Sequence, residues 1–119
     1  MAARRGGTRR LTFASIAASS PASWRSYDDA RNANRGAFSS AAEWARYGNL
    51  LERANDLGKL PAQIYVGASD SFVPVVRRLR DRLPDPGVVH ISKGCHDESY
   101  WRSQAPAQLR TIGSALAAV

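Results

Sequence analysis

Two residues of this sequence, Asp70 and His96, combine types and positions that suit proton-transfer chemistry. Asp70 follows an apolar run at 64–66, and His96 follows another at 88–91. Between the runs, apolar residues recur at helical spacing over 72–83, with arginines on the other side. A strand, a helix and a second strand in this order predict a parallel α/β unit, whose strands end at one common edge. We therefore expect the Asp70 carboxylate to lie beside the His96 imidazole.

A carboxylate beside an imidazole fixes the tautomer of the ring and stabilises its positive charge when it accepts a proton. These are two of the three groups of a hydrolytic triad, and the third is a nucleophile. Such enzymes expose a serine hydroxyl at a Gly-x-Ser-x-Gly turn between a strand and a helix. The sequence contains no such motif. None of the serines near the expected site has this setting: Ser19, Ser20, Ser69 and Ser99.

Cys95 is the single cysteine of the sequence and adjoins His96, so a thiol nucleophile is an alternative. Adjacent residues of an extended chain point to opposite sides, which places the pair poorly for direct proton transfer. We expect a buried, unreactive thiol instead. His90, Cys95, His96 and Asp97 lack a recognised metal-ligand spacing, so the sequence indicates no metal and no cofactor. His90 lies within a predicted strand, where a packed or hydrogen-bonded histidine is expected.

Both candidate residues also have purely structural interpretations. Asp70 precedes the predicted helix, so its oxygens could accept hydrogen bonds from the first free amides. That role is compatible with the catalytic one. His96 taken alone could be an exposed loop histidine.

The surrounding residues resemble those of a known enzyme family. Asp70-Ser71-Phe72 resembles an Asp-x-Phe loop, and the segment 94–101 resembles a Gly-x-His-x-x-x-Tyr-Trp pattern. Both occur in this order in α/β-hydrolases of the esterase group that includes S-formylglutathione hydrolases and mycolyltransferase-like esterases. The segment 13–24 resembles the strand and loop that precede them in that family. The similarity covers residues 10 to 119 of this sequence, but not the nucleophile motif.

The resemblance implies that residues 11–119 form the C-terminal half of an α/β-hydrolase domain. The expected architecture is a partial α/β fold of about three parallel strands with crossover helices. We expect the strands at 11–18, 62–67 and 88–92.

The resemblance also assigns roles to residues of the expected site. Asp70 matches the triad acid and His96 the triad base. Trp24, Phe72 and Trp101 are candidates for lining a substrate pocket, with packing over the sheet edge as the plainer role of Trp24. The substrate of the intact family is a small ester.

Two helices outside this unit are predicted from end signals and periodicity. Ser40 and Glu43 have capping-box spacing, so a helix should begin near Ser40. The last helix should begin near Glu98 and run almost to the end, with Pro106 kinking or dividing it. Its buried face is expected to carry Leu109, Ile112 and Leu116.

The formal net charge is +7, and Arg4, Arg5, Arg9 and Arg10 contribute four of the charges. We expect residues 1–10 to be a basic, disordered end. Nucleic-acid binding is a weaker alternative, because no aromatic platform or nucleic-acid module accompanies the arginines. No run is long enough to span a membrane. We expect a cytoplasmic protein, with export through the twin-arginine-like stretch at 8–13 as the alternative.

Three functional hypotheses follow. The first is a truncated esterase-like protein that carries the triad Asp and His without a nucleophile and is inactive alone. The second is a non-catalytic fragment whose open sheet edge, at the strand 11–18, pairs with another polypeptide or with itself. The third is a basic protein associated with nucleic acid.

Overall fold

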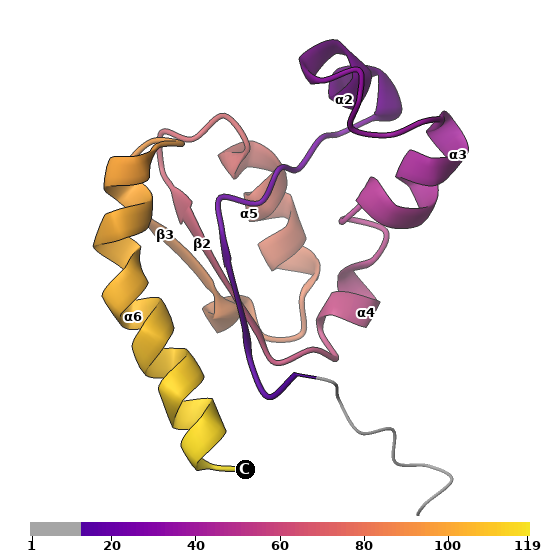
Figure 1. Cartoon of the computed structure of the whole chain (residues 1–119). Coiled ribbons are helices and arrows are strands. Elements are labelled where there is room, and N and C mark those ends of the chain that lie inside the picture. Colours follow the sequence, from indigo (N-terminus) through magenta and orange to yellow (C-terminus); the bar gives the residue numbers. More distant parts are fainter. Residues whose placement is uncertain (1–12) are drawn as a thin grey trace, which may run out of the picture.

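The computed structural model describes residues 13–119, which form one sheet with helices on both faces (Figure 1). The strands are β1 (Ile16–Ser19), β2 (Ala62–Gly67) and β3 (Val89–Ser92). They are parallel and adjacent in chain order, with β2 in the centre. The predicted α/β class with three parallel strands is therefore confirmed. The basic segment 1–10 and most of the twin-arginine-like stretch lie outside the described residues.

Helical segments connect the strands and close the chain. None within the described residues is long and apolar enough to cross a membrane. In chain order they are α2 (Tyr27–Ala33), α3 (Ala41–Glu43), the π-helical turn η1 (Trp44–Gly48), α4 (Ala54–Leu57), α5 (Val73–Arg82), the 3₁₀ turn η2 (Pro86–Val88) and α6 (Glu98–Ala117).

The hydrophobic core lies between the sheet and α5. Alternate residues of the strands face this side, because successive side chains of a strand point to opposite faces. They pack against the apolar stripe of α5, whose arginines remain on the outside. The core residues are Ala54, Ile64, Val66, Val73, Val76, Leu79, Leu83 and Val89.

The first strand is shorter than the sequence predicted. We expected it to span 11–18, yet β1 begins only at Ile16, whose amide donates to the carbonyl of Pro61 at 2.9 Å. The partner strand β2 starts immediately after this proline, so residues 13–15 have no strand beside them with which to form backbone hydrogen bonds. Phe13 is accordingly 61% exposed rather than buried in a strand.

The predicted helix start at Ser40 is confirmed. The Ser40 hydroxyl accepts a hydrogen bond from the amide of Glu43 at 3.1 Å. The Glu43 carboxylate returns to the amide and hydroxyl of Ser39, one residue earlier than in a standard capping box. The helix then widens into the π-helical turn that ends at Gly48.

The last helix, α6, is continuous through Pro106, so this proline neither divides the helix nor ends it. The expected buried face is wrong, because Leu109 is 68% and Leu116 is 61% exposed. The helix instead faces the sheet with a mostly polar side, on which Gln108 Nε2 donates to Ser19 Oγ of β1 at 2.6 Å. That contact leaves both leucines on a flank of the helix that no described element covers.

Candidate functional site

Asp70 and His96 meet at the carboxyl edge of the sheet. The Oδ2 atom of Asp70 lies 2.8 Å from Nδ1 of His96, which confirms the proximity predicted from the sequence. The Asp70 side chain is fully buried, whereas that of His96 is 41% exposed. The pair therefore combines a carboxylate shielded from water with an imidazole that reaches the surface.

The other carboxylate oxygen of Asp70 is also occupied. Oδ1 accepts the Phe72 amide at 2.8 Å, and the Asp70 carbonyl accepts the Val73 amide at 3.1 Å. Asp70 thus fixes the turn that leads into α5, although it is not the N-cap of that helix. An ionised carboxylate can only accept hydrogen bonds, so with Asp70 in that form Nδ1 of His96 is the donor of this bond. Its Nε2 atom is then the basic nitrogen.

Backbone contacts join the loop after β2 to the loop after β3. The Ala68 amide donates to the Ser92 carbonyl at 2.7 Å, and the Ser69 amide donates to the Gly94 carbonyl at 2.9 Å. A Cβ atom on Gly67 would lie 2.3 Å from the Gly94 carbonyl oxygen. Only glycine lets the two loops approach so closely, and this approach brings Asp70 within reach of His96.

Gly94 and the start of α6 fix the position of His96. Gly94 has φ of +152°, and a Cβ atom there would lie 2.3 Å from the Tyr100 ring. Asp97 caps α6 by accepting the Tyr100 amide at 2.9 Å. Tyr100 is buried, with its hydroxyl 3.1 Å from Ser92 Oγ. His96 is therefore held between a glycine turn and a capped helix.

Aromatic rings surround the imidazole. The rings of Phe72 and Trp101 lie edge-on to His96, at centroid distances of 5.4 and 5.3 Å. The indole N–H of Trp101 donates to Ser20 Oγ at 2.8 Å, which anchors that ring to the end of β1. Trp24 lies one ring further out, 5.5 Å from Phe72. Of the three predicted pocket residues, Phe72 and Trp101 therefore pack against His96, whereas Trp24 packs against Phe72.

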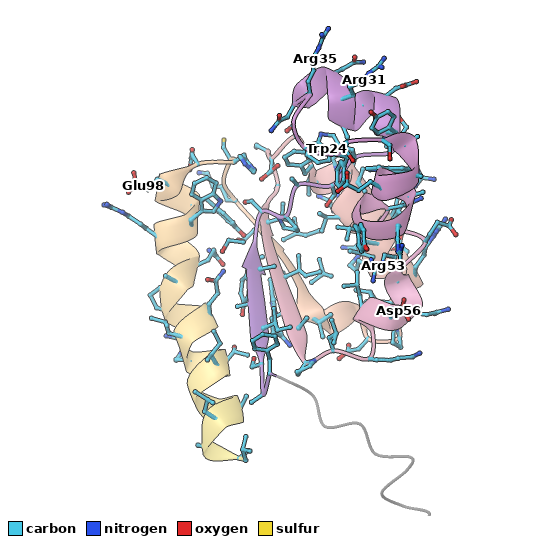
Figure 2. The ribbon with its side chains drawn as sticks, turned by 45° about the vertical axis from the view of Figure 1, so that its right-hand side comes forward. Trp24, Arg31, Arg35, Arg53, Asp56 and Glu98 are labelled. Carbon is cyan, nitrogen blue, oxygen red and sulfur yellow. The ribbon has the colours of Figure 1, made fainter. Side chains whose placement is uncertain are left out.

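An open groove of about 330 Å³ adjoins these rings. Trp24, labelled in Figure 2, and Phe72 form part of its wall, and both belong to the aromatic group beside His96. Arg25 and Asp29 add charge at the rim. The full lining is Ser23, Trp24, Arg25, Asp29, Ala33, Ser71, Phe72, Pro74 and Val75.

The hydroxyl and thiol groups nearest in sequence do not complete a triad. Within residues 13–119, the side-chain hydrogen bond of His96 goes to Asp70 and to no serine or cysteine. Ser20 is 5% exposed, and its oxygen is occupied by the Trp101 indole. Cys95 is exposed, so the expectation of a buried thiol is wrong. The side chain of His96 points inward to Asp70, so the adjacent side chain of Cys95 points to solvent.

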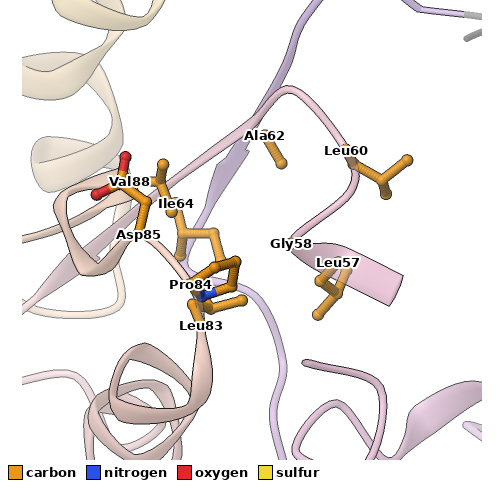
Figure 3. A pocket seen from close by; sticks show the side chains of 9 residues that line it. All are labelled: Leu57, Gly58, Leu60, Ala62, Ile64, Leu83, Pro84, Asp85 and Val88. Atoms are coloured by element: carbon orange, nitrogen blue, oxygen red, sulfur yellow. The ribbon is translucent and has the colours of Figure 1, made fainter. Parts of the chain in front are cut away.

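Other features lie apart from this site. A small pocket of about 50 Å³ is lined mainly by apolar residues, including Ala62 and Val88, at the amino ends of the strands (Figure 3). His90 Nε2 lies 2.7 Å from Gln63 Oε1 and its ring stacks on Tyr65, which confirms the expected packed histidine. No group of three potential metal ligands gathers within the described part of the chain.

Sequence patterns alone missed two positioning residues. Gly67 ends an ordinary apolar strand, and nothing in its neighbours signals the contact with Gly94 that requires it. Ser20 anchors the Trp101 ring and has a positive φ of 48°, and nothing in the neighbouring sequence indicates this role. Comparison of the chain with models of protein families, with curated proteins and with solved structures gave no match.

Proposed function

We propose that this chain is the acid–histidine part of an esterase-like hydrolase that cleaves small carboxylic esters or thioesters. Asp70 orients the ring and His96 is the general base. The nucleophile belongs to polypeptide outside these 119 residues, so the chain alone is inactive. We place it in the cytoplasm, with export through the stretch at 8–13 as the alternative.

The chemistry assigned to each residue follows from its position. His96 Nε2 removes the proton of a serine hydroxyl as that oxygen attacks the ester carbonyl, and later returns the proton to the leaving group. Asp70 Oδ2 holds Nδ1–H and stabilises the imidazolium that forms between these steps. The aromatic wall of Phe72 and Trp101 limits the access of water to the ring.

One observation supports the proposal above all others, namely the 2.8 Å contact between a buried carboxylate and a half-exposed imidazole. A carboxylate without solvent contact is costly unless each oxygen is well bonded. Asp70 meets this condition by bonding the Phe72 amide and His96. The arrangement suits a ring that must hold one tautomer while its other nitrogen exchanges a proton.

A second candidate function is pairing with another polypeptide through β1. The amides of Ile16 and Ser20 donate to β2, so by alternation the backbone groups of Ala17 and Ser19 point away from the sheet. An edge strand of this kind is a template for a further strand.

A fluorophosphonate probe, which labels activated serine hydroxyls, tests the proposed hydrolase. The protein is captured from cells that carry the gene, together with any polypeptide joined or bound to it, and the labelled peptide is sequenced. We expect the labelled serine to lie outside the 119 residues and the labelling to disappear in a His96→Ala strain. Labelling that persists in that strain, or none at all in the captured material, would reject the proposal.

A further inference from the structure

Within residues 13–119, one edge of β1 has no strand beside it and one flank of α6 is uncovered. These two features belong to one surface, which we name the β1–α6 surface. Its strand part is Ile16–Ser19, which Figure 1 shows in the foreground without a helix in front of it. Its helix part is the apolar stripe Ala105, Leu109, Ile112 and Leu116.

Contacts of α6 show on which side this stripe lies. Gln104, Ala107 and Thr111 line a groove toward β3, whereas Gln108 bonds Ser19 of β1. Successive helix residues are about 100° apart, so positions 105, 109, 112 and 116 lie on the flank away from that groove. This flank is on the side of the free edge of β1. The unpaired backbone and the exposed leucines therefore form one continuous surface.

We propose that the occupant of the β1–α6 surface is a second copy of this chain, related by a two-fold axis perpendicular to the sheet. Such an axis, passing midway between the two copies of Ala18, places β1 antiparallel to its copy. Ala17 of each protomer then faces Ser19 of the partner, giving about four backbone hydrogen bonds. The same axis keeps both copies of α6 on one face, so the two apolar stripes meet. One two-fold rotation therefore pairs the edge of β1 and also covers the apolar stripe of α6.

The size and charge of the surface fit this occupant. Leu109 is 68% and Leu116 is 61% exposed. A specific interface buries at least about 1,000 Å² in total, so each copy must contribute about half of this area from the two leucines, the half-buried stripe residues and the strand edge. None of the side chains in the surface is charged, so two chains of net charge +7 make no like-charge contact there.

This proposal concerns a surface outside the acid–histidine site and does not depend on the proposed hydrolase. A strand that delivered a nucleophile would compete for the same edge. The dimer is therefore the state of the 119-residue chain purified by itself.

Sedimentation equilibrium of the purified chain tests the dimer. We expect a mass of twice 12.9 kDa at micromolar concentration. Leu109→Lys with Leu116→Lys should raise the dimer dissociation constant at least tenfold, because two charges per copy enter an apolar contact. Ser114→Lys with Ala118→Lys adds the same charge to one exposed position of α6 and to its exposed C-cap, away from the stripe, and should leave the mass unchanged.

Ala17→Pro provides an independent arm on the strand. It removes an amide that points away from β2, so it should yield monomers that keep the far-ultraviolet circular dichroism of the parent chain. A monomeric parent, a species larger than a dimer, or a dimer that survives both the lysine pair and Ala17→Pro would overturn the proposal.

Discussion

The imidazole of His96 and the carboxylate of Asp70 are held 2.8 Å apart by loops that follow neighbouring parallel strands. The histidine ring is half exposed and the carboxylate is fully buried. In the proposed mechanism this asymmetry suits two different tasks, with the buried carboxylate fixing the tautomer and the exposed imidazole exchanging a proton. Each prediction below changes one part of this arrangement or of the elements that support it.

Asp70→Ala should destabilise the fold by about 1–3 kcal/mol, because the part-buried Phe72 amide and His96 Nδ1–H both lose their acceptor. Urea denaturation measures the change. Asp81→Ala is the matched control, since that carboxylate is exposed and forms only a long contact with Arg80. The control should change the stability by less than about 0.5 kcal/mol. Equal effects of the two variants would contradict a structural role for the Asp70 bonds.

Gly67→Ala should separate Asp70 from His96, because the new methyl group would lie 2.3 Å from the Gly94 carbonyl oxygen. Nitrogen-15 spectra of the imidazole report the loss, since a free ring no longer holds one tautomer. Gly113→Ala is the control, as a Cβ atom there has no neighbour within 4 Å. In the middle of α6 that change should stabilise the chain by about 0.5–1 kcal/mol. A Gly67→Ala spectrum identical to that of the parent would show that the close approach is unimportant.

Glu43 should make the start of α3 sensitive to acid. Hydrogen bonds from the Ser39 hydroxyl and then the Ser39 amide lower its pKa below the ordinary value of 4.5. A carboxyl group whose pKa is lower in the folded chain stabilises that state above the unfolded pKa, and this contribution is lost as pH falls through the folded pKa. The carboxyl carbon-13 shift of Glu43 should therefore titrate at lower pH in the folded chain than in urea. Ser39→Ala should move the folded midpoint upward, and coincident midpoints for folded and unfolded chains would contradict the account.

The basic residues should bind nucleic acid only weakly. Arg31 and Arg35 project outward from the region of α2 (Figure 2), but no aromatic platform for bases accompanies the arginines of the sequence. Arg82 is already bonded to Glu52 at 3.5 Å and to the Leu51 carbonyl at 3.0 Å. A salt titration of binding to a random DNA duplex measures the number of phosphate contacts from its slope. We expect weak binding with a shallow slope. Tight binding with a slope corresponding to about six or more phosphate contacts would favour the nucleic-acid hypothesis.

The pairing of Asp70 with His96 was predictable, because strand–helix–strand periodicity determines which strand ends share an edge. The exposure of Leu109 and Leu116 was not. Helical periodicity indicates which residues of α6 share a face, but not whether a partner covers that face. The length of β1 was also not predictable. It depends on where the neighbouring strand β2 begins after Pro61, and a local apolar run does not indicate the start of a distant strand. The sequence therefore predicted the Asp70–His96 pair better than it predicted the packing of α6 or the length of β1.

Hydrolysis of p-nitrophenyl acetate by the purified 119-residue chain tests the central claim most directly. The claim is that Asp70 and His96 form a proton-transfer pair whose nucleophile is not in this chain. Free imidazole at equal concentration and the His96→Ala variant are the controls. We predict a rate per molecule no greater than that of free imidazole, because no hydroxyl within residues 13–119 bonds to His96. The sequence also lacks the nucleophile turn, whose following amide forms part of an oxyanion hole. Turnover at least about 100-fold faster than imidazole, abolished by His96→Ala, would contradict the claim by showing that the chain supplies its own nucleophile.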